Sequence, residues 1–123
     1  MKSRDSTVRM MRFQIEDRRR QVGQIETMIE EFGRMISDLD HEIAAEHRRT
    51  GIEDEKHFAY STFARAARQR RANLGASVAE LTGQLDTAKA ALDLALAELE
   101  REEEKLERES THDSGRSATR AAS

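Results

Sequence analysis

Residues 51–63 read GIEDEKHFAYSTF, and they separate two long stretches in which apolar residues recur at alternating spacings of three and four. Such a repeat keeps one apolar stripe on one side of an α-helix, facing a partner helix. The string between the stripes starts with Gly51, a residue suited to the left-handed position that ends a helix, and it is mostly polar up to His57. We therefore predict two long helices joined by a corner at residues 51–60.

The first stripe predicts a helix over about residues 4–50, with Ser3 or Ser6 available to cap its start. Its period is about 3.5 residues rather than 2, so its many β-branched residues indicate helix and not strand. Ten of its twelve positions are apolar, which is enough for a continuous seam. The stripe consists of Val8, Met11, Ile15, Arg18, Val22, Ile25, Ile29, Phe32, Ile36, Leu39, Ile43 and Glu46.

The second stripe predicts a helix over about residues 61–109, capped by Ser61 or Thr62. Its alanines let the partner backbone approach closely beside the bulky residues of the first stripe. Beyond Glu109 the sequence is polar and aperiodic, so residues 110–123 are expected to form a disordered tail. The stripe consists of Tyr60, Ala64, Ala67, Arg71, Leu74, Val78, Leu81, Leu85, Ala88, Leu92, Ala95, Leu99, Glu102 and Leu106.

Charged blocks indicate how the two stripes pair. Residues 2–20 are net basic and residues 98–109 are net acidic, while the acidic residues of 38–46 precede the corner and the arginines of 65–71 follow it. A chain that folds back at about residue 54 places each block beside the opposite charge, whereas a parallel homodimer places like charges together. We therefore predict an all-α fold, in which two long helices form an antiparallel coiled-coil hairpin.

Four charged residues interrupt the stripes, namely Arg18, Glu46, Arg71 and Glu102. We interpret them as register markers whose long side chains reach out of the seam. A direct functional role for these residues is the alternative.

The composition agrees with a single hairpin domain at residues 1–109. The chain is 37% charged and 4% aromatic and contains no Pro, which is typical of a coiled coil rather than of a globule with a thick core. The absence of Cys excludes disulfides and Cys-ligated metals. No apolar run is long enough to cross a membrane, and the N-terminus lacks a signal-peptide pattern, so we expect a cytoplasmic protein.

The sequence contains no arrangement of residues that is typical of a catalytic site. There is no phosphate-binding loop and no nucleophile–base pattern, and a two-helix fold offers no pocket for a reacting group. His41 and His47 are six residues apart, which does not place them on one helix face as metal binding requires. We expect no enzymatic activity, no cofactor and no metal.

Two groups of basic residues, at 18–20 and 65–71, could in principle bind phosphates. The preferred interpretation is that they pair with the opposing acidic blocks, because aromatic residues for base stacking are not interleaved with them. We therefore expect no nucleic-acid partner.

Three of the five aromatic residues lie at the corner, and they are the best candidates for a binding site. Tyr60 is in phase with the second stripe and is expected to pack inward. Phe58 and Phe63 are out of phase. Either they fold over Ile52 and close the end of the hairpin, or they stand exposed as anchors for a partner, a role in which aromatic residues are enriched.

Several strings in the chain carry a family resemblance. They are MKSRDS at 1–6, RFQIE at 12–16, IETMI at 25–29 and, most specifically, the corner string from Gly51 to Leu74 that includes HFAY and TFARAA. Neither helix propensity nor coiled-coil packing requires that corner string. From residue 1 to about residue 108 the chain resembles the flagellar export protein FliJ as found in alphaproteobacteria. One departure is Ser61, where Pro is expected in relatives.

The resemblance implies a function. Members of the FliJ family are cytoplasmic antiparallel coiled coils, similar to the rotor stalk of rotary ATPases. One end, made of the N- and C-terminal parts, enters the hexameric ring of the flagellar type III export ATPase, and the other tip contacts the membrane export gate. The proteins also handle export chaperones. We therefore expect a non-enzymatic stalk or adaptor at the flagellar basal body, needed for motility and chemotaxis and touching the membrane only through the gate.

The alternatives to the export function are a small holdase-type chaperone and a structural coiled-coil dimer.

Residues of this chain can be assigned to the two implied contacts. For the gate side, at the corner, the candidates are Ile52, His57, Phe58, Tyr60 and Phe63. For the ATPase side they are Arg9, Arg12, Phe13, Leu96 and Leu99.

Overall fold

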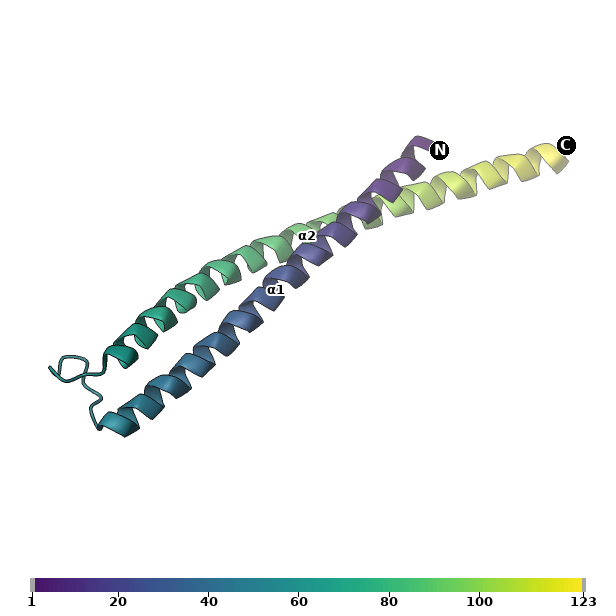
Figure 1. Cartoon of the computed structure of the whole chain (residues 1–123). Helices are drawn as coiled ribbons and strands as arrows, with labels where there is room; N and C mark the ends of the chain where they lie inside the picture. Colours follow the sequence, from purple (N-terminus) through teal and green to yellow (C-terminus); the bar gives the residue numbers. More distant parts are fainter. Residues whose placement is uncertain (1, 123) are drawn as a thin grey trace. The chain divides into compact units, whose positions relative to one another are not determined.

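A computed structural model describes the backbone of residues 2–122 and the side chains of residues 3–113. Helix α1 spans Lys2–Thr50 and helix α2 spans Thr62–Ala122, and this described range contains no strand (Figure 1). The two helices pack against each other in antiparallel directions, so the predicted all-α coiled-coil hairpin is confirmed.

The chain divides into two packing units that are described separately below. The corner unit is Gly23–Asp86, and the terminal unit is Met1–Val22 together with Thr87–Ser123.

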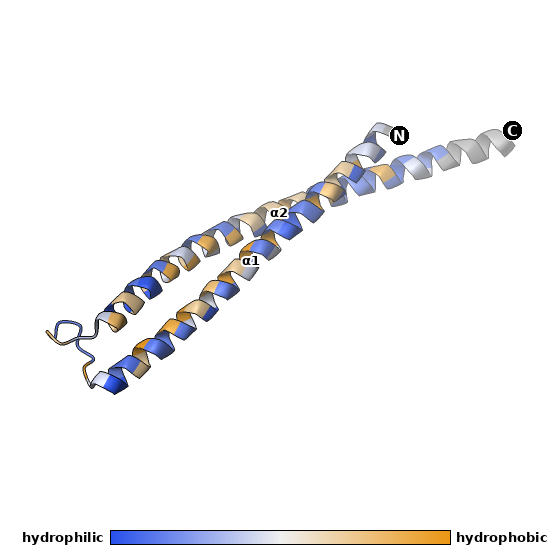
Figure 2. Ribbon diagram, in the orientation of Figure 1, coloured by the Kyte–Doolittle hydropathy of each residue, from blue (hydrophilic) through white to orange (hydrophobic). Residues whose placement is uncertain are grey.

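The core of the corner unit lies between α1 and α2 and contains only residues of the two stripes. Leu39, Ile43 and Ala67 form its buried cluster, against which Leu74 packs. Ala64 is completely buried, so its small side chain lets the helices approach closely next to the corner. Figure 2 shows the hydrophobic residues alternating with hydrophilic ones along both helices, as the heptad pattern requires.

The core of the terminal unit is built on three β-branched residues of α1. Val8, Ile15 and Val22 are buried, with 1%, 3% and 9% of their surfaces exposed. The α2 stripe facing them, from Ala88 to Leu106, is half-buried. In both units every apolar residue of the two predicted stripes is buried or half-buried, so the predicted seam is confirmed.

Both helix ends at the corner use the residues that the sequence indicates. Gly51 has a φ of 72°, and its N–H donates a 2.8 Å hydrogen bond to the carbonyl oxygen of His47. The hydroxyl of Ser61 accepts a 3.1 Å hydrogen bond from the N–H of Ala64, which makes Ser61 the cap of α2.

Helix α2 extends beyond its predicted end at about residue 109, while disorder of residues 110–123 stays a prediction. The structure continues α2 through residues 110–122. This stretch contains no Pro and a single Gly, so no residue in it terminates a helix that already propagates from residue 62.

Ion pairs between the helices confirm the alignment predicted from the charge blocks. In the terminal unit Arg4 lies 2.8 Å from Glu102 and 2.7 Å from Glu109. Arg12 lies 3.6 Å from Glu103 in the same unit. In the corner unit Arg71 is paired with Asp40, and the hydrogen bond from its guanidinium lowers the pKa of the Asp40 carboxyl.

The charged residues that interrupt the stripes are exposed or half-buried. Arg71 and Glu102 form the ion pairs described above, and Glu46 is half-buried beside Arg49. Arg18 is exposed. Within the described part of the chain, neither helix has an apolar segment suited to crossing a membrane.

Candidate partner-binding site at the corner

The corner between α1 and α2 is shaped by hydrogen bonds to Asp54 and His57. The N–H of His57 donates to the Asp54 carbonyl at 3.1 Å, and the N–H of Lys56 donates to the Asp54 carboxylate at 2.9 Å. His57 in turn accepts at its own carbonyl from the N–H of Tyr60, at 3.0 Å. Its ring Nδ1 accepts from the N–H of Ala59, also at 3.0 Å. These four bonds hold the backbone of residues 54–60 in one turn-rich conformation.

Tyr60 anchors the corner from inside, as its phase in the second stripe predicts. It is 6% exposed, and its hydroxyl lies 2.8 Å from Nε2 of His47 on α1. The rings of Tyr60 and His47 are 5.6 Å apart, and the guanidinium of Arg65 sits 5.2 Å from the Tyr60 ring centroid. Tyr60 therefore ties the loop to both helices, and its ring is not available at the surface.

Phe58 projects from the corner into solvent. It is 96% exposed, and its only ring partner in the described structure is His57, whose ring stacks on it at 4.7 Å and 22°. Phe63, on the first turn of α2, is 55% exposed. The sequence left open whether these rings close the end of the hairpin or stand exposed, and the structure places both at the surface. Ile52 is half-buried.

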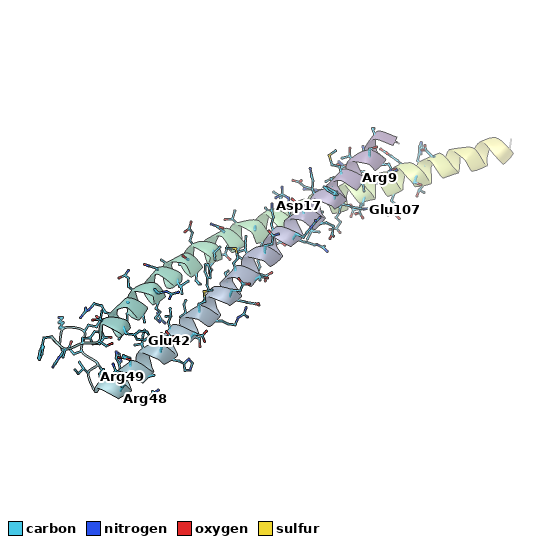
Figure 3. All side chains as sticks on the ribbon, viewed as in Figure 1. Arg9, Asp17, Glu42, Arg48, Arg49 and Glu107 are labelled. Carbon is cyan, nitrogen blue, oxygen red and sulfur yellow. The ribbon has the colours of Figure 1, made fainter. Side chains whose placement is uncertain are left out.

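Charged residues connect the corner to the helices through ion pairs and hydrogen bonds. Glu46 on α1 is paired with Arg49 and accepts a 3.0 Å hydrogen bond from the Ser61 hydroxyl. The Arg49 hydrogen bond is the main cause that lowers the pKa of the Glu46 carboxyl, with Ser61 contributing in the same direction. Figure 3 shows Arg49 with Arg48 at the end of α1, next to the loop.

The loop itself is held to α2 through Glu55. Its carboxylate is paired with Arg68, and its backbone carbonyl accepts a 2.9 Å hydrogen bond from Arg65. Phe58 is thus presented by a loop that is bonded at several points, rather than by a free chain segment, and Phe63 follows on the first turn of α2.

The second set of candidate residues lies in the terminal unit. Arg9 is exposed and pairs with Asp5, while Arg12 pairs with Glu103. Phe13 is 70% exposed beside a surface hollow of about 240 Å³ that is lined by Phe13, Gln14, Asp17, Arg18 and Gln21. Figure 3 labels Arg9 and Asp17 on this part of α1. The other candidates, Leu96 and Leu99, are half-buried.

Two further exposed apolar residues of the terminal unit were not among the candidates. Met10 is 63% exposed and Leu94 is 59% exposed. Their signal in the sequence is that both are apolar and fall outside the stripes. Met10 also precedes Phe13 by three residues, which puts both on the same outward face of α1.

The chemistry of the corner is that of a binding surface. It offers an apolar ring of large area on a fixed loop, with polar and charged side chains around it. In the described residues no cluster of His, Asp and Glu is placed to hold a metal ion.

Comparison of the chain with protein-family models, with curated proteins and with solved structures gives no match.

Proposed function

We propose that the protein is a non-enzymatic coiled-coil stalk or adaptor of the bacterial flagellar type III export apparatus. In this role it links the export ATPase to the membrane export gate and handles export chaperones, in the cytoplasm at the flagellar basal body. The observation that carries the proposal is Phe58, 96% exposed on a hydrogen-bonded corner, within the very string that resembles FliJ.

The gate contact is proposed for the corner because the corner has the properties of a binding hot spot. Exposed aromatic rings dominate the energetics of many interfaces when they enter a pocket of the partner. Phe58 and Phe63 supply two such rings, and His57 stacks on the first. The loop's hydrogen bonds reduce the conformational entropy lost on binding, which favours affinity. Tyr60 is buried and holds the loop to α1 through its hydrogen bond with His47.

The ATPase contact is proposed for the terminal unit. Its α1 segment carries an excess of arginine, including Arg9 and Arg12, and its exposed ring is Phe13. Leu96 and Leu99 add apolar surface from α2. A strongly charged surface of this kind orients a protein in the field of its partner and speeds association.

Binding measurements with purified components test both contacts. The Phe58→Ala/Phe63→Ala variant is expected to lose affinity for the cytoplasmic domain of the export gate by about tenfold or more, and to keep its affinity for the export ATPase. Phe13→Ala is the matched control, since it removes an exposed ring from the other unit. It is expected to weaken ATPase binding and to leave gate binding unchanged.

Two results would contradict the proposal. One is a deletion strain that swims normally and assembles normal flagella. The other is a purified protein that binds neither component. If such a protein suppresses aggregation of unfolded clients without any ATPase, the holdase alternative takes its place.

A further inference from the structure

One flank of the corner unit carries two exposed methionines. Met28 and Met35 of α1 are seven residues apart, and each directly precedes a residue of the first stripe. Their side chains are exposed, at 42% and 47%. Glu42 continues the same row after another seven residues. We call this side the Met flank.

The other flank carries the polar contacts between the helices. Asp40 and His47 are also seven residues apart, but each directly follows a residue of the stripe. Asp40 is paired with Arg71, and His47 is hydrogen-bonded to Tyr60. Ser61 of α2 reaches Glu46 on this side as well. Ion pairs and hydrogen bonds therefore occupy this flank, and the Met flank lies on the opposite side of the seam.

Helix α2 contributes a matching row to the Met flank. Its members directly precede residues of the second stripe, and they are Phe63, Arg70, Ser77 and Gln84. Ser77 and Gln84 are uncharged, so these two heptad rows carry no charge next to Met28 and Met35, although the exposed Glu31 and Glu80 lie beside the rows. Toward the corner the same rows continue with Glu42 and Arg70, both exposed and neither in an ion pair within the described structure.

The seam beneath the Met flank is incompletely covered by two helices. Ile29, Phe32 and Ile36 of α1 are half-buried, and so are Leu74 and Val78 of α2. Two helices alone leave one edge of such a seam open to water, whereas four helices enclose it. A flank in which exposed methionines recur at the heptad period suits a further pair of helices.

We propose that this flank binds a second copy of the chain, so that two corner units form a parallel, two-fold symmetric four-helix bundle. In this arrangement α1 of each copy packs against α2 of the other. Glu42 of one copy then faces Arg70 of the second copy, and the same contact recurs by symmetry. An antiparallel arrangement centred on the methionines would place Glu42 of one copy far from Arg70 of the other and leave both charges unpaired. The proposal goes beyond the export function and does not depend on it.

Sedimentation of the full chain over a range of concentrations tests the proposal. The wild-type chain is expected to dimerise, and Met28→Gln/Met35→Gln to raise the dimer dissociation constant by about tenfold or more. Gln is a good helix former, so the helices are kept, and circular dichroism checks this. Met10→Gln, at a still more exposed methionine in the terminal unit, is the matched control and leaves the dissociation constant unchanged.

Charge reversal tests the parallel orientation. Glu42→Arg and Arg70→Glu are each expected to weaken self-association by about tenfold, because the symmetric contact is lost twice. An equimolar mixture of the two variants is expected to associate as well as wild type, since both contacts are then between opposite charges. A chain that stays monomeric, a dimer unaffected by the methionine variant, or a mixture no better than its components would overturn the proposal. None of these outcomes changes the expected gate or ATPase binding, so the two proposals fail separately.

Discussion

At the scale of single residues, Gly51 has the clearest conformational role. Its φ of 72° lies in the region that side-chain-bearing residues avoid, and it is the only residue with a positive φ in the described chain. A Cβ added at Gly51 would meet no atom within 4 Å, so the demand for glycine comes from the backbone and not from crowding. Gly33 is equally open but lies inside α1, where glycine only weakens the helix.

The two glycines are therefore expected to respond to alanine with opposite signs. Gly51→Ala should lower the free energy of unfolding by about 1–2 kcal/mol, because alanine is strained in the left-handed conformation. Gly33→Ala should raise it by about 0.5–1 kcal/mol, because the unfolded chain loses freedom and the helix gains propensity. Urea denaturation followed by circular dichroism measures both. Equal effects of one sign would contradict the assigned role of Gly51.

At the scale of elements, the corner contains one buried aromatic ring and one exposed aromatic ring with different roles. Tyr60 is buried and bonded to His47, whereas Phe58 two residues earlier is almost fully exposed. Because the rings have different surroundings, substitutions at them should affect different properties.

Tyr60→Phe removes the hydroxyl that binds His47 and keeps the ring in the seam. It is expected to lower the free energy of unfolding by about 1 kcal/mol, as for a typical hydrogen bond. Phe58→Ala, at an exposed site, is expected to change stability by less than about 0.5 kcal/mol. Thermal or urea unfolding of both variants checks this contrast. A large loss of stability from Phe58→Ala would show that the ring packs against the corner after all.

At the scale of the whole molecule, carboxylates paired across or along the helices link stability to pH. The pKa of Asp40 is lowered from its usual 3.8, mainly by the hydrogen bond from Arg71. The pKa of Glu46 is lowered from its usual 4.5, mainly by the hydrogen bond from Arg49. A group with a lowered pKa in the folded state stabilises the fold fully above its unfolded pKa, and this contribution disappears as the pH falls through the folded value.

The melting temperature is therefore expected to be level above about pH 5 and to fall progressively below the ordinary carboxylate range. Asp40→Asn removes one of the linked groups, so it should lower the melting temperature at neutral pH and reduce the further fall in acid. Asp38→Asn is the matched control, because Asp38 is exposed on the same helix and has no ion pair in the described chain. Identical acid profiles for Asp40→Asn and wild type would contradict the linkage.

Periodicity and charge sign were sufficient to predict the hairpin, because both are properties of the chain that do not depend on surroundings. The stripe that contains Val8 and Ile43 is buried as expected, and Arg4 and Arg71 meet acidic residues of the other helix. Gly51 and Ser61 likewise occupy the end positions that their backbone and hydroxyl chemistry favour. The expectation of a disordered tail rested on composition alone, and it stays a prediction.

The corner at residues 51–63 shows what the tertiary structure alone decided. The sequence placed three aromatic rings there and determined, through heptad phase, that Tyr60 turns inward. It did not determine that Phe58 stands exposed, or that the Tyr60 hydroxyl forms a hydrogen bond with His47 on α1. The exposure of a ring outside the stripe depends on which segments pass near it, and those segments come together only when the chain has folded.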